Sequence, residues 1–255
     1  MKYLGGKQRL GKHIAKVILE YKEKYDVDNY IEPFCGALGV LVNISPHFKN
    51  VYASDYHCDL IAMWEGLKTG EFIPPKVITE TKYNSIKKMD SPNALKAFVG
   101  FGLSFGGRFF GAYAPKYTNG KKEDYLKEAK NSLNRKRPLI LNVDFKCLDY
   151  KKLKPKNSII YCDPPYAYNK YPIKYRRDTK YYDVFDNDEF WKIMRKWSKN
   201  NLVIISETRA PNDFIKIWEK EKINTSSKAG KTTLKNIDEI VITEKLFIHQ
   251  KYSEL

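Results

Sequence analysis

Hydrophobic and polar positions along this chain switch between two periods, and the switch predicts strands interleaved with helices. From Arg9 to Lys24 the apolar residues recur every three to four positions, which is typical of an amphipathic helix, and Leu60 to Leu67 is also helical in pattern. Short β-rich runs occur at Asn29–Phe34, Asn50–Asp55, Ser158–Cys162 and Asn201–Ser206, and Ile237–Phe247 predicts a late strand or hairpin. Strands and helices that alternate in this way favour an α/β fold with a doubly wound, Rossmann-like sheet.

The stretch from about Gly70 to Pro138 interrupts this alternation. It contains a helical run at Lys82–Met89, a glycine- and aromatic-rich run at Phe98–Tyr113, and a charged helical run at Lys121–Arg137. We therefore predict a mainly helical subdomain at residues 70–138, inserted into a main domain made of residues 1–69 and 139–255.

Four consecutive residues, Asp163-Pro164-Pro165-Tyr166, follow one of the predicted strands directly. Prolines lack the N–H group needed for strand pairing and fix φ near −65°, so the strand ends there in a stiff loop. Ligands of open α/β sheets bind at the carboxyl ends of the strands. A carboxylate, a proline carbonyl and an aromatic ring at that place could grip a planar group that bears an amino substituent. The alternative is a proline-stiffened turn with an aspartate that caps a helix.

A glycine loop with Gly36 and Gly39 follows the predicted strand Asn29–Phe34, and Asp55 ends the next strand 16 positions after Gly39. Glycines after a strand let the backbone approach a cofactor closely, and an acid at the next strand end can bind ribose hydroxyls. The loop lacks the GxGxxG pattern, which argues against a nicotinamide or flavin cofactor. An ordinary strand–helix turn, with Asp55 as a helix cap, is the alternative.

The charge of the chain points to a polyanionic partner. Lysine and arginine outnumber acidic residues 46 to 30, giving a formal net charge of +16, and many of the 19 tyrosines stand among basic residues, as in Lys174–Arg177. Basic groups hold phosphates and aromatic rings stack on unpaired bases. A compositional bias on solvated faces is the alternative source of part of this excess.

The four cysteines are Cys35, Cys58, Cys147 and Cys162, and they form no CxxC pair. This argues against a zinc site, and each cysteine is predicted to be a small buried apolar residue. No apolar run is long enough to span a bilayer and the first residues show no signal-peptide core, so the sequence predicts a soluble, intracellular protein without a membrane partner.

In order along the chain, six segments resemble the Dam-like, D12-class (alpha group) DNA adenine-N6 methyltransferases, which use S-adenosylmethionine. The segments are Tyr3–Lys7, Glu32–Ala37, Ser54–Ile61, Asp144–Phe145, Asp163–Tyr166 and Gly230–Glu239. The resemblance runs from Tyr3 to about Phe247. One departure is Leu38, which stands where the family usually carries the second glycine of the cofactor loop.

The resemblance implies a Rossmann-like methyltransferase sheet, S-adenosylmethionine as cofactor with S-adenosylhomocysteine as product, and no metal. It implies a catalytic loop of Asp163, Pro164, Pro165 and Tyr166. The implied cofactor residues are Tyr3, Gly6, Lys7, Glu32, Phe34, Gly36, Asp55, Asp144, Phe145 and Asp163. Lys7 is expected near the cofactor's methionine part or near the target base.

The implied reaction is site-specific methylation of adenine N6 in duplex DNA. Our hypothesis is that the Asp163 carboxylate and the Pro164 carbonyl accept hydrogen bonds from the two N6–H groups of an adenine that has been flipped out of the duplex. Tyr166 stacks on this adenine. Ser206 and Glu207 either border this target pocket or simply end a strand.

Duplex DNA is the partner that the resemblance and the charge imply. Candidate DNA-binding residues are Arg108, Lys170, Lys174, Arg176 and Arg177. Two alternatives stay open: methylation of cytosine N4 or of RNA, and a catalytically inactive DNA-binding relative. The region between the cofactor loop and Asp163, where the family reads its DNA sequence, is only loosely similar to the family. No recognition sequence, restriction-modification partner or oligomeric state on DNA therefore follows from the sequence.

Overall fold

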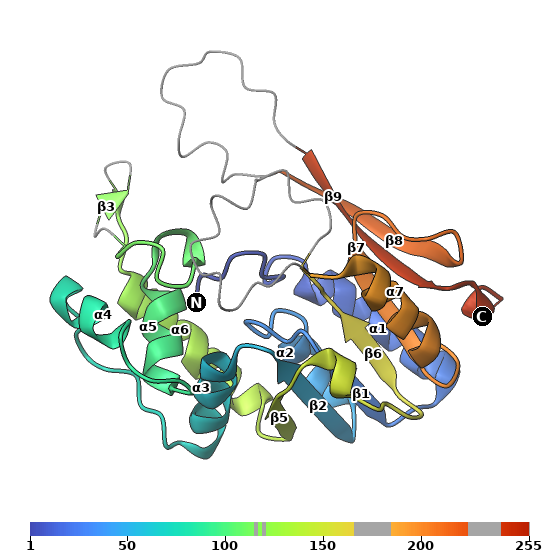
Figure 1. The fold of residues 1–255 in the computed structure, drawn as a ribbon, viewed down its shortest axis with the longest axis horizontal. Coiled ribbons are helices and arrows are strands. Elements are labelled where there is room, and N and C mark those ends of the chain that lie inside the picture. Colours follow the sequence, from blue (N-terminus) through green and yellow to red (C-terminus); the bar gives the residue numbers. More distant parts are fainter. Residues whose placement is uncertain (115–116, 119–120, 166–184, 224–240, 255) are drawn as a thin grey trace, which may run out of the picture.

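The computed structural model describes residues 1–114, 117–118, 121–165, 185–223 and 241–254. At its centre is a seven-stranded sheet in the order β5-β2-β1-β6-β7-β9-β8 (Figure 1). The strands are β1 (Asn29–Glu32), β2 (Asn50–Asp55), β5 (Val143–Cys147), β6 (Ile159–Cys162), β7 (Leu202–Glu207), β8 (Phe214–Ile223) and β9 (Val241–His249).

The strand order contains a switch point at the middle of the sheet. The chain builds outward from β1 through β2 to β5 on one side, then returns to β6 and builds outward through β7 on the other. These five strands are parallel, whereas β9 runs antiparallel to both β7 and β8. Open α/β sheets bind ligands at the carboxyl ends of the strands beside such a reversal, which here means the ends of β1 and β6.

Helices cover both faces of the sheet. The helix α1 (Gly11–Tyr25) buries Ile14 and Ile18 in a cluster with Tyr161, whereas α7 (Asn187–Trp197) buries Phe190 in a second cluster with Ile160. Neighbouring residues of a strand point to opposite faces, so α1 and α7 lie on opposite sides of β6. The short helix α2 (Leu41–Ile44) and the longer α3 (Cys58–Thr69) complete this part of the fold.

The chain between α3 and β5 is mainly helical. It forms α4 (Glu80–Ile86), α5 (Ala94–Gly102) and α6 (Tyr125–Lys136), with the two-residue strands β3 (Tyr117–Thr118) and β4 (Lys121–Lys122), and Figure 1 shows these helices beside α3. Trp64 of α3, Phe98 of α5 and Leu133 of α6 are fully buried in one hydrophobic cluster that also contains residues of the sheet. The insertion therefore shares its core with the sheet, and its assignment to a separate domain stays a prediction.

The predicted α/β fold with a doubly wound sheet is confirmed, and most predicted elements lie within three residues of the observed ones. Two strands of the seven-stranded sheet, β5 and β8, were not predicted, and neither were the two-residue strands β3 and β4. In β8, apolar and charged residues share one exposed edge strand, so its pattern resembles that of a surface helix or loop. Of the late strand predicted at Ile237–Phe247, residues 237–240 lie outside the described residues, and β9 begins at Val241.

Within the described ranges, no helix has both the length and the apolar character required to cross a membrane.

Candidate active site

A buried ion pair joins the N-terminal segment to the end of β6. Lys7 Nζ lies 2.7 Å from Asp163 Oδ1, and the two side chains are 5% and 19% exposed. The backbone carbonyl of Lys7 accepts hydrogen bonds from the amides of Leu10 (3.0 Å) and Gly11 (2.6 Å), so the turn that leads into α1 fixes the position of Lys7. Two residues 156 positions apart in the sequence thus meet at the switch point of the sheet.

The predicted catalytic loop begins where β6 ends. Asp163 follows the last strand residue directly, Pro164 is buried and Pro165 is half-buried. Tyr166, the fourth residue of the loop, lies outside the described residues.

Glu32 ends β1, next to the end of β6, and is only 2% exposed. The Tyr30 hydroxyl donates a 2.7 Å hydrogen bond to Glu32 Oε2. Burial raises the pKa of Glu32 to about 8, and nearby Asp163 acts in the same direction, whereas the Tyr30 hydrogen bond and Lys136 oppose the rise. A cationic ligand group placed beside Glu32 would favour its charged form.

The loop after β1 is held by hydrogen bonds from both sides. The Gly36 amide donates to Asp55 Oδ2 (2.9 Å), and the Gly36 carbonyl accepts from Trp64 Nε1 (2.9 Å). Gly36 has φ +45°, and an added Cβ would lie 3.2 Å from the Tyr3 ring. Glycine therefore suits both the left-handed backbone and the close approach of Tyr3.

Leu38 is accommodated by turning into the core. Its φ is 58°, which explains why glycine suits this position, and its side chain is fully buried. Gly39 then packs under the N-terminal segment, because an added Cβ there would lie 2.9 Å from the Lys7 backbone.

Asp55 ends β2 and binds two backbone amides, one through each carboxylate oxygen. Oδ1 accepts from the His57 amide and Oδ2 from the Gly36 amide, both at 2.9 Å. Burial raises the pKa of Asp55 and these hydrogen bonds oppose the rise. Each carboxylate oxygen has a second lone pair, so the arrangement can still accept hydrogen bonds from a ligand hydroxyl.

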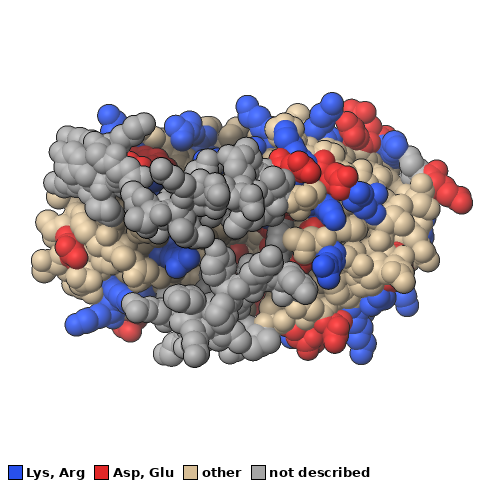
Figure 2. All heavy atoms as spheres, turned by 90° about the horizontal axis from the view of Figure 1, so that it is seen from above, with Lys and Arg blue, Asp and Glu red and all other residues tan. Residues whose placement is uncertain are grey.

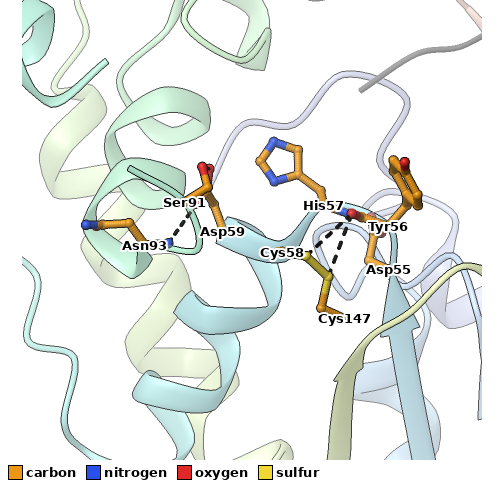
Figure 3. Close-up of a disulfide and its surroundings, with 8 residues drawn as sticks. All are labelled: Asp55, Tyr56, His57, Cys58, Asp59, Ser91, Asn93 and Cys147. Carbon is orange, nitrogen blue, oxygen red and sulfur yellow. Dashed lines mark hydrogen bonds between the residues drawn. A yellow bond between two sulfur atoms is a disulfide. The ribbon is translucent and has the colours of Figure 1, made fainter. Parts of the chain in front are cut away.

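Cys58 and Cys147 form a disulfide beside Asp55, which corrects the prediction that all four cysteines are buried apolar residues (Figure 3). The parallel pairing of β2 with β5 sets Cys147 opposite Asp55, and Cys58 begins α3 three residues later. Their Cα atoms are 5.0 Å apart despite a sequence separation of 89 residues. Sequence spacing could not show this contact, because the register of β5 creates it. Cys35 and Cys162 are buried and free, as predicted.

Asp144 and Phe145 lie away from the edge formed by Asp55. In the register of β5 against β2, Asp144 stands opposite Tyr52, three residues before Asp55. The Asp144 side chain is 46% exposed and lies 3.3 Å from Lys146, whereas Phe145 is buried. Cys147 and the following residue occupy the carboxyl edge of β5 instead, so the role of Asp144 and Phe145 in cofactor binding stays a prediction.

Phe34 belongs to an aromatic cluster under the loop. Its ring lies 5.0 Å from Tyr150 and 6.1 Å from both Phe185 and Phe190. The cluster anchors the start of the loop to the face of the sheet that α7 covers.

Arg108 is exposed on a segment that touches the N-terminal motif. The Leu4 amide donates to the Gly107 carbonyl at 3.2 Å, and a Cβ added to Gly107 would lie 2.5 Å from the Tyr3 nitrogen. Figure 2 shows lysine and arginine side chains spread over the described part of one face, with acidic side chains among them. The other four predicted DNA contacts, Lys170, Lys174, Arg176 and Arg177, lie outside the described residues.

No pattern in the sequence identified two of the side chains that lie at the site. Lys136, at the end of α6, donates a hydrogen bond to the Ala37 carbonyl and so links the helical insertion to the loop after β1. Burial lowers its pKa to about 8, with Arg135 acting in the same direction and Glu32 opposing. Glu244 of β9 lies 3.4 Å from Lys7 Nζ. Among the residues that the structure describes, no three His, Cys, Asp or Glu side chains come together as a metal site.

Several solved structures are similar to this chain at low identity. TrmN from Thermus thermophilus is 10% identical with a TM-score of 0.37, and the match covers 93% of this chain and 48% of TrmN, so the chain spans about half of its length. An S-adenosylmethionine-dependent methyltransferase from Clostridium acetobutylicum is 12% identical with a TM-score of 0.35, covering 96% of this chain and 79% of that one. Magnesium protoporphyrin IX methyltransferase from Synechocystis, with bound SAM, is 8% identical with a TM-score of 0.36, covering 95% and 79%.

No curated protein matches the sequence. A family model does match, over residues 3–98 and 108–234, and its description is D12 class N6 adenine-specific DNA methyltransferase. This match covers most of the chain and includes the N-terminal motif Tyr3–Lys7, the Gly36 loop, Asp55 and Asp163–Tyr166. The chain therefore belongs to the D12 class N6 adenine-specific DNA methyltransferase family.

Proposed function

We propose that this protein transfers a methyl group from S-adenosylmethionine to N6 of adenine at a specific sequence in duplex DNA. The observation that carries the proposal is the position of Asp163, held by Lys7 at the switch point of the sheet, beside Glu32 and the Gly36 loop. Family membership supports the choice of adenine N6 as acceptor.

The residues around the Gly36 loop fit the cofactor. Asp55 would accept hydrogen bonds from the ribose hydroxyls, and the missing side chain of Gly36 lets the Tyr3 ring lie close against the loop. Glu32 would face a ligand cation, because a carboxyl whose pKa is raised by burial gains most from a positive charge placed beside it. When bound, S-adenosylmethionine supplies a methyl group carried on a positively charged sulfur.

Asp163 and Pro164 would prepare the acceptor. The lone pair of adenine N6 is delocalised into the ring, so the free amine is a poor nucleophile. The Asp163 carboxylate and the Pro164 carbonyl would each accept a hydrogen bond from one of its two N–H groups. Both oxygens would favour the positive charge that develops on N6. Once N6 carries the methyl group it loses one proton, which Asp163 can accept and pass to water.

The target adenine has to leave the base stack to reach Asp163. Flipping costs a few kcal/mol, and stacking on an aromatic ring such as Tyr166 returns roughly 1–3 kcal/mol. Arg108, Lys170, Lys174, Arg176 and Arg177 would hold the DNA through phosphates or base edges, with residues 70–138 as the target-recognition subdomain.

The variant Asp163→Ala tests the proposal directly. We expect incorporation of labelled methyl groups into duplex DNA to fall by at least about 100-fold, because the charge that stabilises the transition state is removed. The affinity for S-adenosylmethionine, measured by calorimetry, should change only a few-fold. Asp188→Ala removes an exposed carboxylate on α7 and serves as the matched control.

Retained methyl transfer by Asp163→Ala would sink the assignment of Asp163. Digestion of the methylated DNA identifies the acceptor: N4-methylcytosine, or label found only in RNA, would replace adenine N6 in DNA. Absence of S-adenosylmethionine binding by the wild-type protein would instead indicate a catalytically inactive DNA-binding relative.

A further inference from the structure

Glu244 joins the Lys7–Asp163 ion pair from another strand. It lies on β9, its side chain is fully buried, and its Oε1 is 3.4 Å from Lys7 Nζ. The Ser206 hydroxyl donates a 2.6 Å hydrogen bond to the same oxygen. The Lys7 ammonium therefore lies between two carboxylates, Asp163 at 2.7 Å and Glu244 at 3.4 Å.

The sheet register determines where Glu244 lies. Ser206 of β7 stands opposite Leu246 of β9, so Glu244 is two residues further along on the same face and just past the hydrogen-bonded part of β7. A buried carboxylate is costly unless it is paired and hydrogen-bonded, and here Lys7 and Ser206 supply both. Replacing buried charged groups by well-packed apolar residues is often neutral or stabilising, so stability alone does not account for a second acid so close to Asp163.

The charges of the three groups indicate what the second acid does. In their ionised forms Lys7 contributes one positive charge and Asp163 and Glu244 one negative charge each, so the formal net charge of the cluster is −1. Without Glu244, the Lys7–Asp163 pair would be neutral. A neutral pair stabilises positive charge on a neighbouring amine much less than a net negative group does.

We propose that Glu244 is a positioning residue that shares the ion pair with the Lys7 ammonium. Lys7 then does not fully neutralise Asp163, which keeps negative charge for its hydrogen bond with the target amine. This inference rests on the proposed function, and it assigns a role in the reaction to a residue that does not touch the substrate.

The charge state of Lys7 agrees with this arrangement. Burial acts to lower the pKa of Lys7, but attraction by Asp163 and then by Glu244 prevails, and the pKa is raised. Other titratable groups of this pocket are Glu32 and Cys162, which interact with Asp163, and Tyr161, which interacts with both Asp163 and Glu244. Lys136 acts on Glu32. Removing the charge of Glu244 should therefore lower the pKa of Lys7.

The test compares Glu244→Gln with three control variants. Glutamine keeps the shape and can still accept from Ser206, but it carries no charge. Glu244→Asp keeps the charge, Ser206→Ala removes the hydrogen bond without altering the charge, and Glu219→Gln removes an exposed carboxylate on β8. The measurements are kcat for methyl transfer into DNA across pH, KM for S-adenosylmethionine, thermal stability, and the titration of Lys7 by NMR of carbon-13-labelled lysine.

For Glu244→Gln we expect a kcat about 10- to 100-fold lower, as when one preorganised electrostatic interaction is removed, with KM changed less than about threefold. The alkaline limb of the kcat profile and the Lys7 titration should both move to lower pH. Glu244→Asp should recover part of kcat, Ser206→Ala should mainly lower thermal stability, and Glu219→Gln should resemble wild type.

The proposal is overturned if Lys7 titrates at the same pH in Glu244→Gln and in wild type, or if kcat and its pH profile are unchanged. If the wild-type protein transfers no methyl group to DNA, the proposed function fails. In that case the Lys7 titration still shows whether Glu244 shares its ammonium, so the two failures are distinguishable.

Discussion

At the scale of single residues, β1 ends in a buried acid, Glu32, and β2 ends in a half-buried acid, Asp55. The Asp55 carboxylate accepts hydrogen bonds from two backbone amides, whereas the Glu32 carboxyl accepts one from the Tyr30 hydroxyl. Burial raises both pKa values, and that of Glu32 reaches about 8. A carboxyl in this state holds its proton at neutral pH until a cation arrives, which suits a ligand site better than a structural ion pair.

We predict that Glu32 makes the free protein less stable as pH rises from about 5 to 8. The unfolded chain loses this proton near pH 4.3, whereas the folded chain keeps it up to about 8, so folding binds a proton within this window and the free energy of unfolding falls with pH. Glu32→Gln should lack this contribution. Its free energy of unfolding relative to wild type should rise across the window by up to about 4 kcal/mol.

Urea unfolding at several pH values measures this difference. The control is Glu20→Gln on α1, an exposed glutamate whose replacement should leave the pH slope unaltered. Parallel pH profiles for wild type and Glu32→Gln would show that Glu32 is ionised in the folded protein.

At the scale of elements, the disulfide ties the start of α3 to the end of β5. Both ends lie beside Asp55, so the bond connects the turn after β2 to the strand that pairs with it. The chain that it encloses contains α4, α5 and α6, which places the whole helical insertion inside one covalent loop. Cross-linking such a long loop restricts the unfolded chain strongly.

We predict that Cys147→Ser destabilises the protein. The chain-entropy model gives about 4 to 5 kcal/mol for a loop of this length, which corresponds to a fall in Tm of about 10 °C. Dithiothreitol should lower the Tm of the wild type to that of Cys147→Ser and leave the variant unaltered. Equal Tm values for the oxidised wild type and the variant would mean that the bond contributes no stability.

At the scale of the whole molecule, the chain has a net charge of +16, and the described residues on the face shown in Figure 2 carry basic and acidic side chains side by side. The insertion and the sheet share one core, and Lys136 joins the insertion to the loop after β1. Positive charge favours association with DNA but does not select a sequence.

We predict that affinity for duplex DNA falls steeply with salt because bound phosphates release counterions. Replacing Lys170, Lys174, Arg176 and Arg177 by alanine should reduce the slope of log K against log salt by about 3 to 4, close to one for each side chain that no longer binds a phosphate. The matched control replaces Lys24, Lys49, Lys156 and Lys199, which are exposed near the amino ends of strands. Fluorescence anisotropy with a labelled duplex provides the measurement, and equal slopes for the two variants would refute the assignment.

The sequence by itself determined the α/β class, the positions of most strands, and the two loops that follow β1 and β6. These features are local, because they depend on hydrophobic period, on the backbone limits of glycine and proline, and on an acid at a strand end. They were enough to predict that Asp163, Asp55 and Gly36 gather at one edge of the sheet, since parallel strands bring their carboxyl ends together.

Tertiary structure alone decided which distant residues complete the site. The Cys58–Cys147 bond depends on the register of β5, the place of Glu244 beside Lys7 depends on an antiparallel β9, and the contact of Lys136 with Ala37 depends on how α6 packs. No periodicity in the sequence encodes these contacts, because each joins segments that meet only after the sheet has formed. The sequence thus specified the acids at the strand ends, and the folded chain supplied the charges around them.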